Sequence, residues 1–212
     1  MRQPRRSRHR PTSDRAGHRG RLRTTRQCCA VSVTSSEPPK PVPVGETRIT
    51  LDSPEVQVTD QHSGHQLDLD RYRNLALNVL TDEGVPAGAE LTVVFVSTED
   101  MTELNAKHMG RQEPTDVLAF PIDAHDVNHQ NGDPIPVLLG DVVICPTVAA
   151  ANSSTNSHSY PGHAGSLRDE IDLLVVHGIL HVLGMDHADD EERNLMQASE
   201  RTHLAAFRER DQ

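Results

Sequence analysis

Three histidines near the C-terminal end of the chain have the spacing of a metal site. Residues 177–187 read HGILHVLGMDH, with His177 and His181 four residues apart and His187 six residues further on. Side chains four residues apart share one face of a helix, about 6 Å apart, so both imidazoles can reach one ion at the ~2.0–2.1 Å zinc distance. Gly184 can end the helix in a left-handed conformation, which brings His187 to the same ion.

The residues around these histidines are apolar on nearly all sides, so we expect a buried helix, where unpartnered imidazoles would be costly. Three histidine ligands with an open fourth position are typical of catalytic zinc sites, and the sequence has no CxxC pair to support a structural site. We therefore predict one Zn²⁺ per chain, held by His177, His181 and His187, although imidazoles also suit nickel, copper or iron.

The same spacing occurs in the HExxHxxGxxH motif of the metzincin proteases, but Gly178 stands where those proteases have the glutamate that activates water. Because glycine cannot accept a proton, peptide hydrolysis by that mechanism is disfavoured. The nearest acid is Asp186, which could orient a ligand, activate water, or hold the turn after Gly184. We favour a role in orienting a ligand or in holding the turn.

Hydrophobic periodicity and turn residues predict an alternation of strands and helices, typical of an α/β sandwich with a small mixed sheet. The expected strands are 48–58, 90–96, 117–120 and 137–145, and the expected helices are 67–82, 97–107, 147–152, 166–184 and 189–210. Ser97 and Ser166 are candidate N-caps. Polar loops are expected at 125–133 and 153–165, and we interpret their histidines as solvated while leaving a second, weaker metal site open: His125, His129, His158 and His163.

Charge divides the chain into two parts. The chain has 212 residues and a net charge of −10, yet residues 1–40 carry a net charge of +9 and residues 41–212 a net charge of −19. The Arg- and Ser-rich start cannot bury enough apolar surface to fold, so we predict a disordered extension and Pro-rich linker at 1–47 and a single hydrolase-like domain at 48–212. The extension has four interpretations: a transit peptide, a nucleic-acid-binding arm, a lipidated segment using Cys28 and Cys29, or a dispensable extension.

Composition excludes several classes of protein. Aromatic residues make up only 2% of the chain, which argues against a base-stacking platform for single-stranded RNA but not against RNA as a substrate. No apolar run approaches the ~18–20 residues that span a membrane, so an integral membrane protein is excluded, and we expect no membrane among the partners. The three cysteines form no disulfide framework, which fits a reducing compartment.

Three segments together resemble the YbeY family, bacterial rRNA maturation factors described as metal-dependent endoribonucleases. HGxLHxxGxDH at 177–187 resembles the family's histidine signature, PTDVLAFP at 114–121 resembles its PT[ND]VLSFP strand, and LLGDVVIC at 138–145 resembles its LGDI strand. The resemblance covers about residues 54–208 and leaves the basic extension outside.

The resemblance implies an α/β (α+β) fold in which a mixed, about four-stranded sheet packs with about five or six helices, one of them a zincin-like metal helix. It also implies Zn²⁺ on the three histidines, hydrolysis of single-stranded RNA, and action at the 3′ end of small-subunit rRNA and in ribosome quality control. The expected partners are rRNA in the small ribosomal subunit and a ribosomal protein, without a nucleotide cofactor. The expected compartment is the cytoplasm, or an organelle if residues 1–43 are a transit peptide.

One position departs from the family. Many members have an arginine before the glycine that corresponds to Gly110, where this chain has Met109. Arg111 and Lys107 are nearby cations, so Arg111 is a candidate phosphate contact as well as an ordinary loop residue. Because a net charge of −19 repels RNA, two alternatives stay open: an assembly factor with a mainly structural metal, and a zinc hydrolase of another substrate.

Overall fold

A mixed sheet of four strands lies at the centre of the described structure. The strands are β1 (Glu55–Asp60), β2 (Glu90–Phe95), β3 (Val117–Pro121) and β4 (Leu138–Ile144). Their order in the sheet is β1-β2-β4-β3, in which β3 is antiparallel to β4 and the other pairs are parallel. The computed structural model describes residues 52–122, 137–156 and 160–211.

Five helices surround this sheet in the described residues. They are α1 (Leu69–Asp82), α2 (Thr98–Met109), α3 (Pro146–Asn156), α4 (Leu167–Val182) and α5 (Asp190–Arg210). The sheet and its helices confirm the predicted α/β class. The extension 1–47 and the loop 125–133 lie outside the described residues, so the domain boundary at residue 47 stays a prediction.

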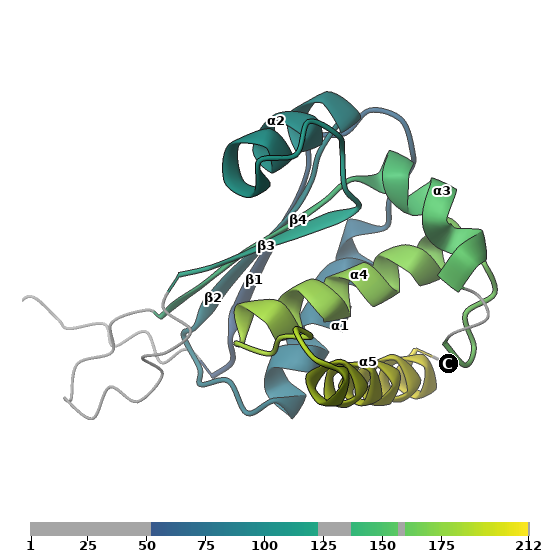
Figure 1. Cartoon of the computed structure of the whole chain (residues 1–212). Coiled ribbons are helices and arrows are strands. Elements are labelled where there is room, and N and C mark those ends of the chain that lie inside the picture. The colour runs from purple at the N-terminus through teal and green to yellow at the C-terminus, as the bar shows by residue number, and fades with distance from the viewer. Residues whose placement is uncertain (1–51, 123–136, 157–159, 212) are drawn as a thin grey trace, which may run out of the picture. The chain divides into compact units, whose positions relative to one another are not determined.

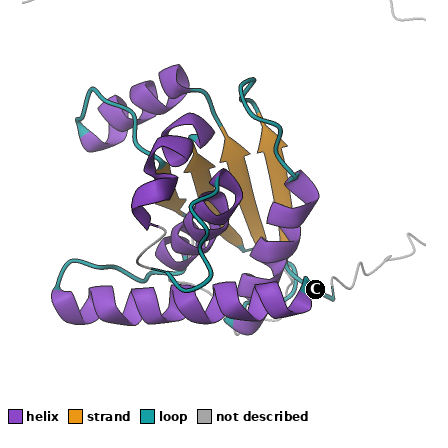
Figure 2. Cartoon of the chain, turned by 90° about the vertical axis from the view of Figure 1, so that its right-hand side faces the viewer, coloured by secondary structure: helices purple, strands orange, loops and turns teal. Residues whose placement is uncertain are grey.

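The two faces of the sheet are covered unequally (Figure 1). On one face, α1 and α4 pack on the strands and contribute to the larger apolar core, and α5 packs against both helices. On the other face, α2 covers a smaller cluster built around Met101, Val143 and Cys145. Figure 2 shows the strands side by side, with α5 as the long helix along the lower edge. None of the described helices combines the length and apolar character needed to cross a membrane.

Capping residues begin the helices where the sequence predicts them. The Ser97 and Ser166 hydroxyls accept hydrogen bonds from the backbone N–H groups of Asp100 and Asp169, both at 3.1 Å. These bonds satisfy donors that the first turn leaves unpaired. Gly110 ends α2 with a φ of 70°, a conformation that favours glycine, so the helix runs to Met109 rather than to Lys107.

Several expected element ends are wrong by one to several residues. β1 begins after Pro54, which has no N–H to donate to a strand neighbour, rather than at residue 48. α1 begins at Leu69 because Asp68 caps it, and α4 ends at Val182, two residues before Gly184. β4 is one residue shorter at each end than expected, and α5 begins after its cap, Asp189.

The loop expected at 153–165 was predicted to start too early, because α3 extends past residue 153. Its first residues, 153–156, continue α3 instead. The Ser153 hydroxyl is buried and donates to the carbonyl of Ala150 at 3.0 Å, so the helix supplies the partner that a polar side chain needs. The serine-rich composition therefore does not end α3 at residue 153, because the Ser153 hydroxyl bonds to the backbone of the same helix.

Candidate metal centre

Helix α4 positions the first two histidines from inside the larger core. Nearly every residue from Glu170 to Val182 is buried, which confirms the expected buried helix. The helix passes close to β4 at Gly178, where a Cβ atom would lie 2.4 Å from Cγ1 of Val142. Glycine is thus the residue that allows α4 to pack on the sheet, and a glutamate in this position would meet the valine.

The structure brings the three predicted ligands together. One nitrogen from each ring of His177, His181 and His187 lies within 4.8 Å of the others. Two nitrogens bound to one ion at ~2.0–2.1 Å are at most about 4 Å apart, so a small closure of the rings would complete the site. His187 comes from the loop after Gly184, whose φ of 95° fits the predicted return of the chain.

Hydrogen bonds orient two of the three rings. Nδ1 of His181 lies 2.9 Å from the backbone carbonyl of Met185, which can only accept, so this nitrogen carries the proton. Nδ1 of His177 lies 2.7 Å from Oε1 of Glu200 in α5. In both rings Nε2 is therefore left with a free lone pair for a metal. Such partners are common behind metal-binding histidines.

The electrostatics of the cluster also suit a cation. Burial, with a smaller effect from the neighbouring His177, lowers the pKa of His181, so this ring is neutral at neutral pH. The neutral form is the one that binds a metal. Tautomers, spacing and charge state of the described residues therefore fit a divalent metal with nitrogen ligands.

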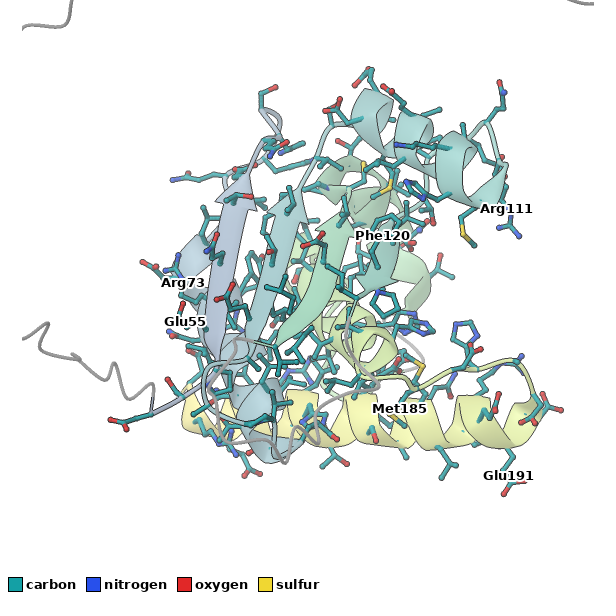
Figure 3. All side chains as sticks on the ribbon, turned by 90° about the vertical axis from the view of Figure 1, so that its left-hand side faces the viewer. Glu55, Arg73, Arg111, Phe120, Met185 and Glu191 are labelled. Carbon is teal, nitrogen blue, oxygen red and sulfur yellow. The ribbon has the colours of Figure 1, made fainter. Side chains whose placement is uncertain are left out.

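A hollow of about 610 Å³ opens in front of the histidines. Its lining joins α4 and the loop after it to the edge strand β3 and to the end of α2: Met109, Thr115–Ala119, Pro121, His177, Gly178, His181 and Gly184–His187. Met109 is 60% exposed and lines the hollow, whereas Arg111 is exposed and does not. Figure 3 shows Arg111 just beyond α2 and Met185 on the turn after α4. No arginine or lysine is among the lining residues that the structure describes.

Two further candidates can be placed. Oδ1 of Asp186 accepts a hydrogen bond from the backbone N–H of His187 at 2.7 Å, so this carboxylate holds the turn. His163 is buried rather than solvated, and its Nε2 lies 3.1 Å from Oε2 of Glu170. Its interpretation as a solvated loop residue is therefore wrong. His125, His129 and His158 lie outside the described residues.

Glu200 is a candidate functional residue that was not predicted from the sequence, although its position in the helix carries a signal. Glu200 lies on the same face of α5 as Met196 and Leu204, which are four residues away on either side and buried. A carboxylate at an apolar position of a helix face needs a buried partner. The apolar periodicity of α5 therefore indicates that Glu200 has a buried partner. That this partner is His177 is known only from the packing of α5 on α4.

The fold and this cluster define a small α/β protein with a candidate three-histidine metal centre beside the edge of its sheet. The family model described as Endoribonuclease YbeY matches residues 57–208. The chain therefore belongs to the Endoribonuclease YbeY family.

Curated relatives agree over most of their length. The chain is 44% identical to Endoribonuclease YbeY of Salinispora tropica, over 69% of this chain and 92% of the relative. It is 41% identical to Endoribonuclease YbeY of Thermobifida fusca, over 69% of this chain and 90% of the relative. A Thermotoga maritima protein, solved in solution, aligns with a TM-score of 0.46 and 20% identity over 74% of this chain and 93% of that one.

Proposed function

We propose that the chain is a zinc-dependent endoribonuclease that cleaves single-stranded RNA, acting at the 3′ end of small-subunit rRNA and in ribosome quality control. The observation that carries the proposal is the cluster of three histidines at the floor of an open hollow, in a chain of the Endoribonuclease YbeY family. The substrate would be rRNA within the small ribosomal subunit, with a ribosomal protein as a further contact and without a membrane or a nucleotide cofactor. The cytoplasm is the compartment, unless residues 1–43 direct the chain to an organelle.

Residues of α4, of the loop after it and of β3 would have separate roles in this reaction. His177, His181 and His187 would hold the zinc, and the carbonyl of Met185 keeps His181 in the tautomer that could bind it. A zinc ion bound there supplies a Lewis acid that offsets charge on a phosphodiester and eases the deprotonation of the attacking water. Gly178 and residues of the edge strand β3 line the hollow into which the RNA would bind. Peptide hydrolysis is disfavoured because Gly178 carries no base and Val142 leaves no room for one.

A direct test uses an RNA substrate that contains the 3′ end of a small-subunit rRNA precursor. Cleavage should fall to background on chelation, return with added zinc, and be absent in His181→Ala. The matched control is His65→Ala, which removes an exposed histidine outside the hollow and should cleave like the wild type. Cleavage that survives in both the chelated protein and His181→Ala would contradict the proposal.

A second candidate function has an observation in its favour. Among the described residues that line the hollow, Asp116 and Asp186 are the acidic ones, and Met109 stands where family members often have arginine. Such a surface repels phosphate, which favours an assembly factor whose metal mainly stabilises the fold. In that case His181→Ala would still bind its ribosomal partner and support subunit assembly, while the wild type would cleave no RNA.

A further inference from the structure

Glu200 is a buried carboxylate whose two oxygens are both used. Glu200 is only 1% exposed and lies on the face of α5 that packs against α4. Oε1 lies 2.7 Å from Nδ1 of His177, and Oε2 accepts a hydrogen bond from the hydroxyl of Tyr160 at 2.5 Å. Both carboxylate oxygens therefore have a hydrogen-bonding partner, as buried polar groups need.

The contact determines which nitrogen of His177 carries the proton. A carboxylate at Nδ1 selects the ring with hydrogen on Nδ1 and leaves the lone pair of Nε2 for the candidate metal centre. A carboxylate partner of this kind is common behind metal-binding histidines, and its loss typically weakens metal binding. Tyr160 donates a hydrogen bond to the second oxygen, which favours the orientation of the carboxylate that faces the histidine.

The three candidate ligands are not held alike. His181 bonds to a backbone carbonyl, which no substitution removes, whereas His177 depends on a side chain from another helix. For His187, the described residues include no hydrogen-bond partner of the ring. Glu200 is thus the position where a substitution can change how one ligand is held while all three histidines remain.

We propose that Glu200, held in place by Tyr160, is the positioning residue for His177 and couples the packing of α5 to metal affinity. This inference rests on the metal centre proposed above. It makes α5 part of the metal centre, although the helix contributes none of the three ligands.

The chain contains a matched control for a purely structural role. His203 of α5 and Glu83 after α1 form a second histidine–carboxylate bond, also of 2.7 Å between Nε2 and Oε1. This bond likewise joins α5 to the rest of the fold, but it touches none of the candidate ligands. Glu83→Ala therefore removes the same type of bond without changing the support of His177.

The experiment combines zinc affinity, from competition with a chromophoric chelator, with ¹⁵N NMR of the histidine rings in the metal-free protein. Glu200→Ala should weaken zinc binding about 10- to 100-fold and lose the preference for hydrogen on Nδ1 of His177. Glu200→Gln keeps an oxygen acceptor, so it should keep that tautomer with a smaller loss of affinity. Tyr160→Phe should behave in the same way, and Glu83→Ala should match the wild type in both measurements.

Two results would overturn the inference: a Glu200→Ala protein with wild-type zinc affinity and tautomer, or an equal loss of affinity in Glu200→Ala and Glu83→Ala. Should Glu200→Ala fail to fold, Glu200→Gln and Tyr160→Phe decide the matter, because unchanged affinity in both would remove the role. A wild-type protein that takes up no zinc would instead contradict the proposed function, so the two failures are distinguishable.

Discussion

The two sides of the hollow are built very differently. On the histidine side, α4 is buried in the larger core, and the rings of His177 and His181 have partners behind them. On the other side, β3 is the edge strand of the sheet, its residues are half-buried except for the exposed Pro121, and Met109 is 60% exposed. Metal ligands must be held in fixed positions, whereas the surface that receives a polymer must be open. In the proposed function, the packed side would hold the metal and the open side would receive the RNA.

If this comparison is right, substitutions on the histidine side affect folding and those on the facing side affect RNA binding. The largest effect is expected for Asp172→Ala. Asp172 in α4 forms a buried pair with Arg71 of α1, with Oδ2 2.7 Å from Nη2 and Oδ1 3.2 Å from Nε. Removing this carboxylate leaves the buried guanidinium with only the half-exposed Asp211 as an acid partner, so the loss should be at the lower end of the range for broken buried pairs, about 3 kcal/mol in urea unfolding.

The matched control for this pair lies on the surface. Asp70 pairs with Arg73 at 2.7 Å, but its side chain is 86% exposed. Asp70→Ala should leave the free energy of unfolding nearly unchanged, because exposed ion pairs contribute little. Equal, small losses in the two variants would contradict the idea that buried contacts fix the histidine side.

A smaller loss is expected for Gly178→Ala. The added methyl group would lie 2.4 Å from Cγ1 of Val142, a stiff side chain in the core, so α4 must shift away from β4. Overpacking of this kind costs about 1–3 kcal/mol in the free energy of unfolding. Adding Val142→Ala should recover part of that loss, so that the double variant loses less than the two single changes together. If the losses in free energy of unfolding were additive, the residue at position 178 and Val142 would not be in contact.

The smallest effect on stability is expected for Met109→Arg on the facing side, where the free energy of unfolding should change by no more than about 0.5 kcal/mol. RNA binding should tighten, and the slope of log K against log salt should steepen by about 0.7, the value for one added phosphate contact on a single strand. The control is Leu195→Arg, which adds the same charge at a residue that is 58% exposed and outside the hollow. Equal changes in both variants would reflect net charge alone.

The residues that could be predicted from the sequence are those whose signals are local. Ser97 and Ser166 mark helix starts by bonding to their own first turn, and HGILHVLGMDH specifies its ligand spacing within eleven residues. Glu200 could not be assigned, because its bond to His177 spans 23 residues and depends on how α5 packs. Likewise, the sequence did not show that Arg111 lies outside the hollow, because the place of a residue in the sequence does not determine where its side chain lies.

The most direct test of the account is the metal content of the purified chain, measured by elemental analysis beside cleavage of an rRNA 3′-end precursor. Wild type and the double variant His177→Ala/His181→Ala would be prepared together. The account predicts about one zinc per wild-type chain and RNA cleavage, with both lost in the variant. A wild-type chain without any bound transition metal, or cleavage that is equal in the two proteins, would contradict it.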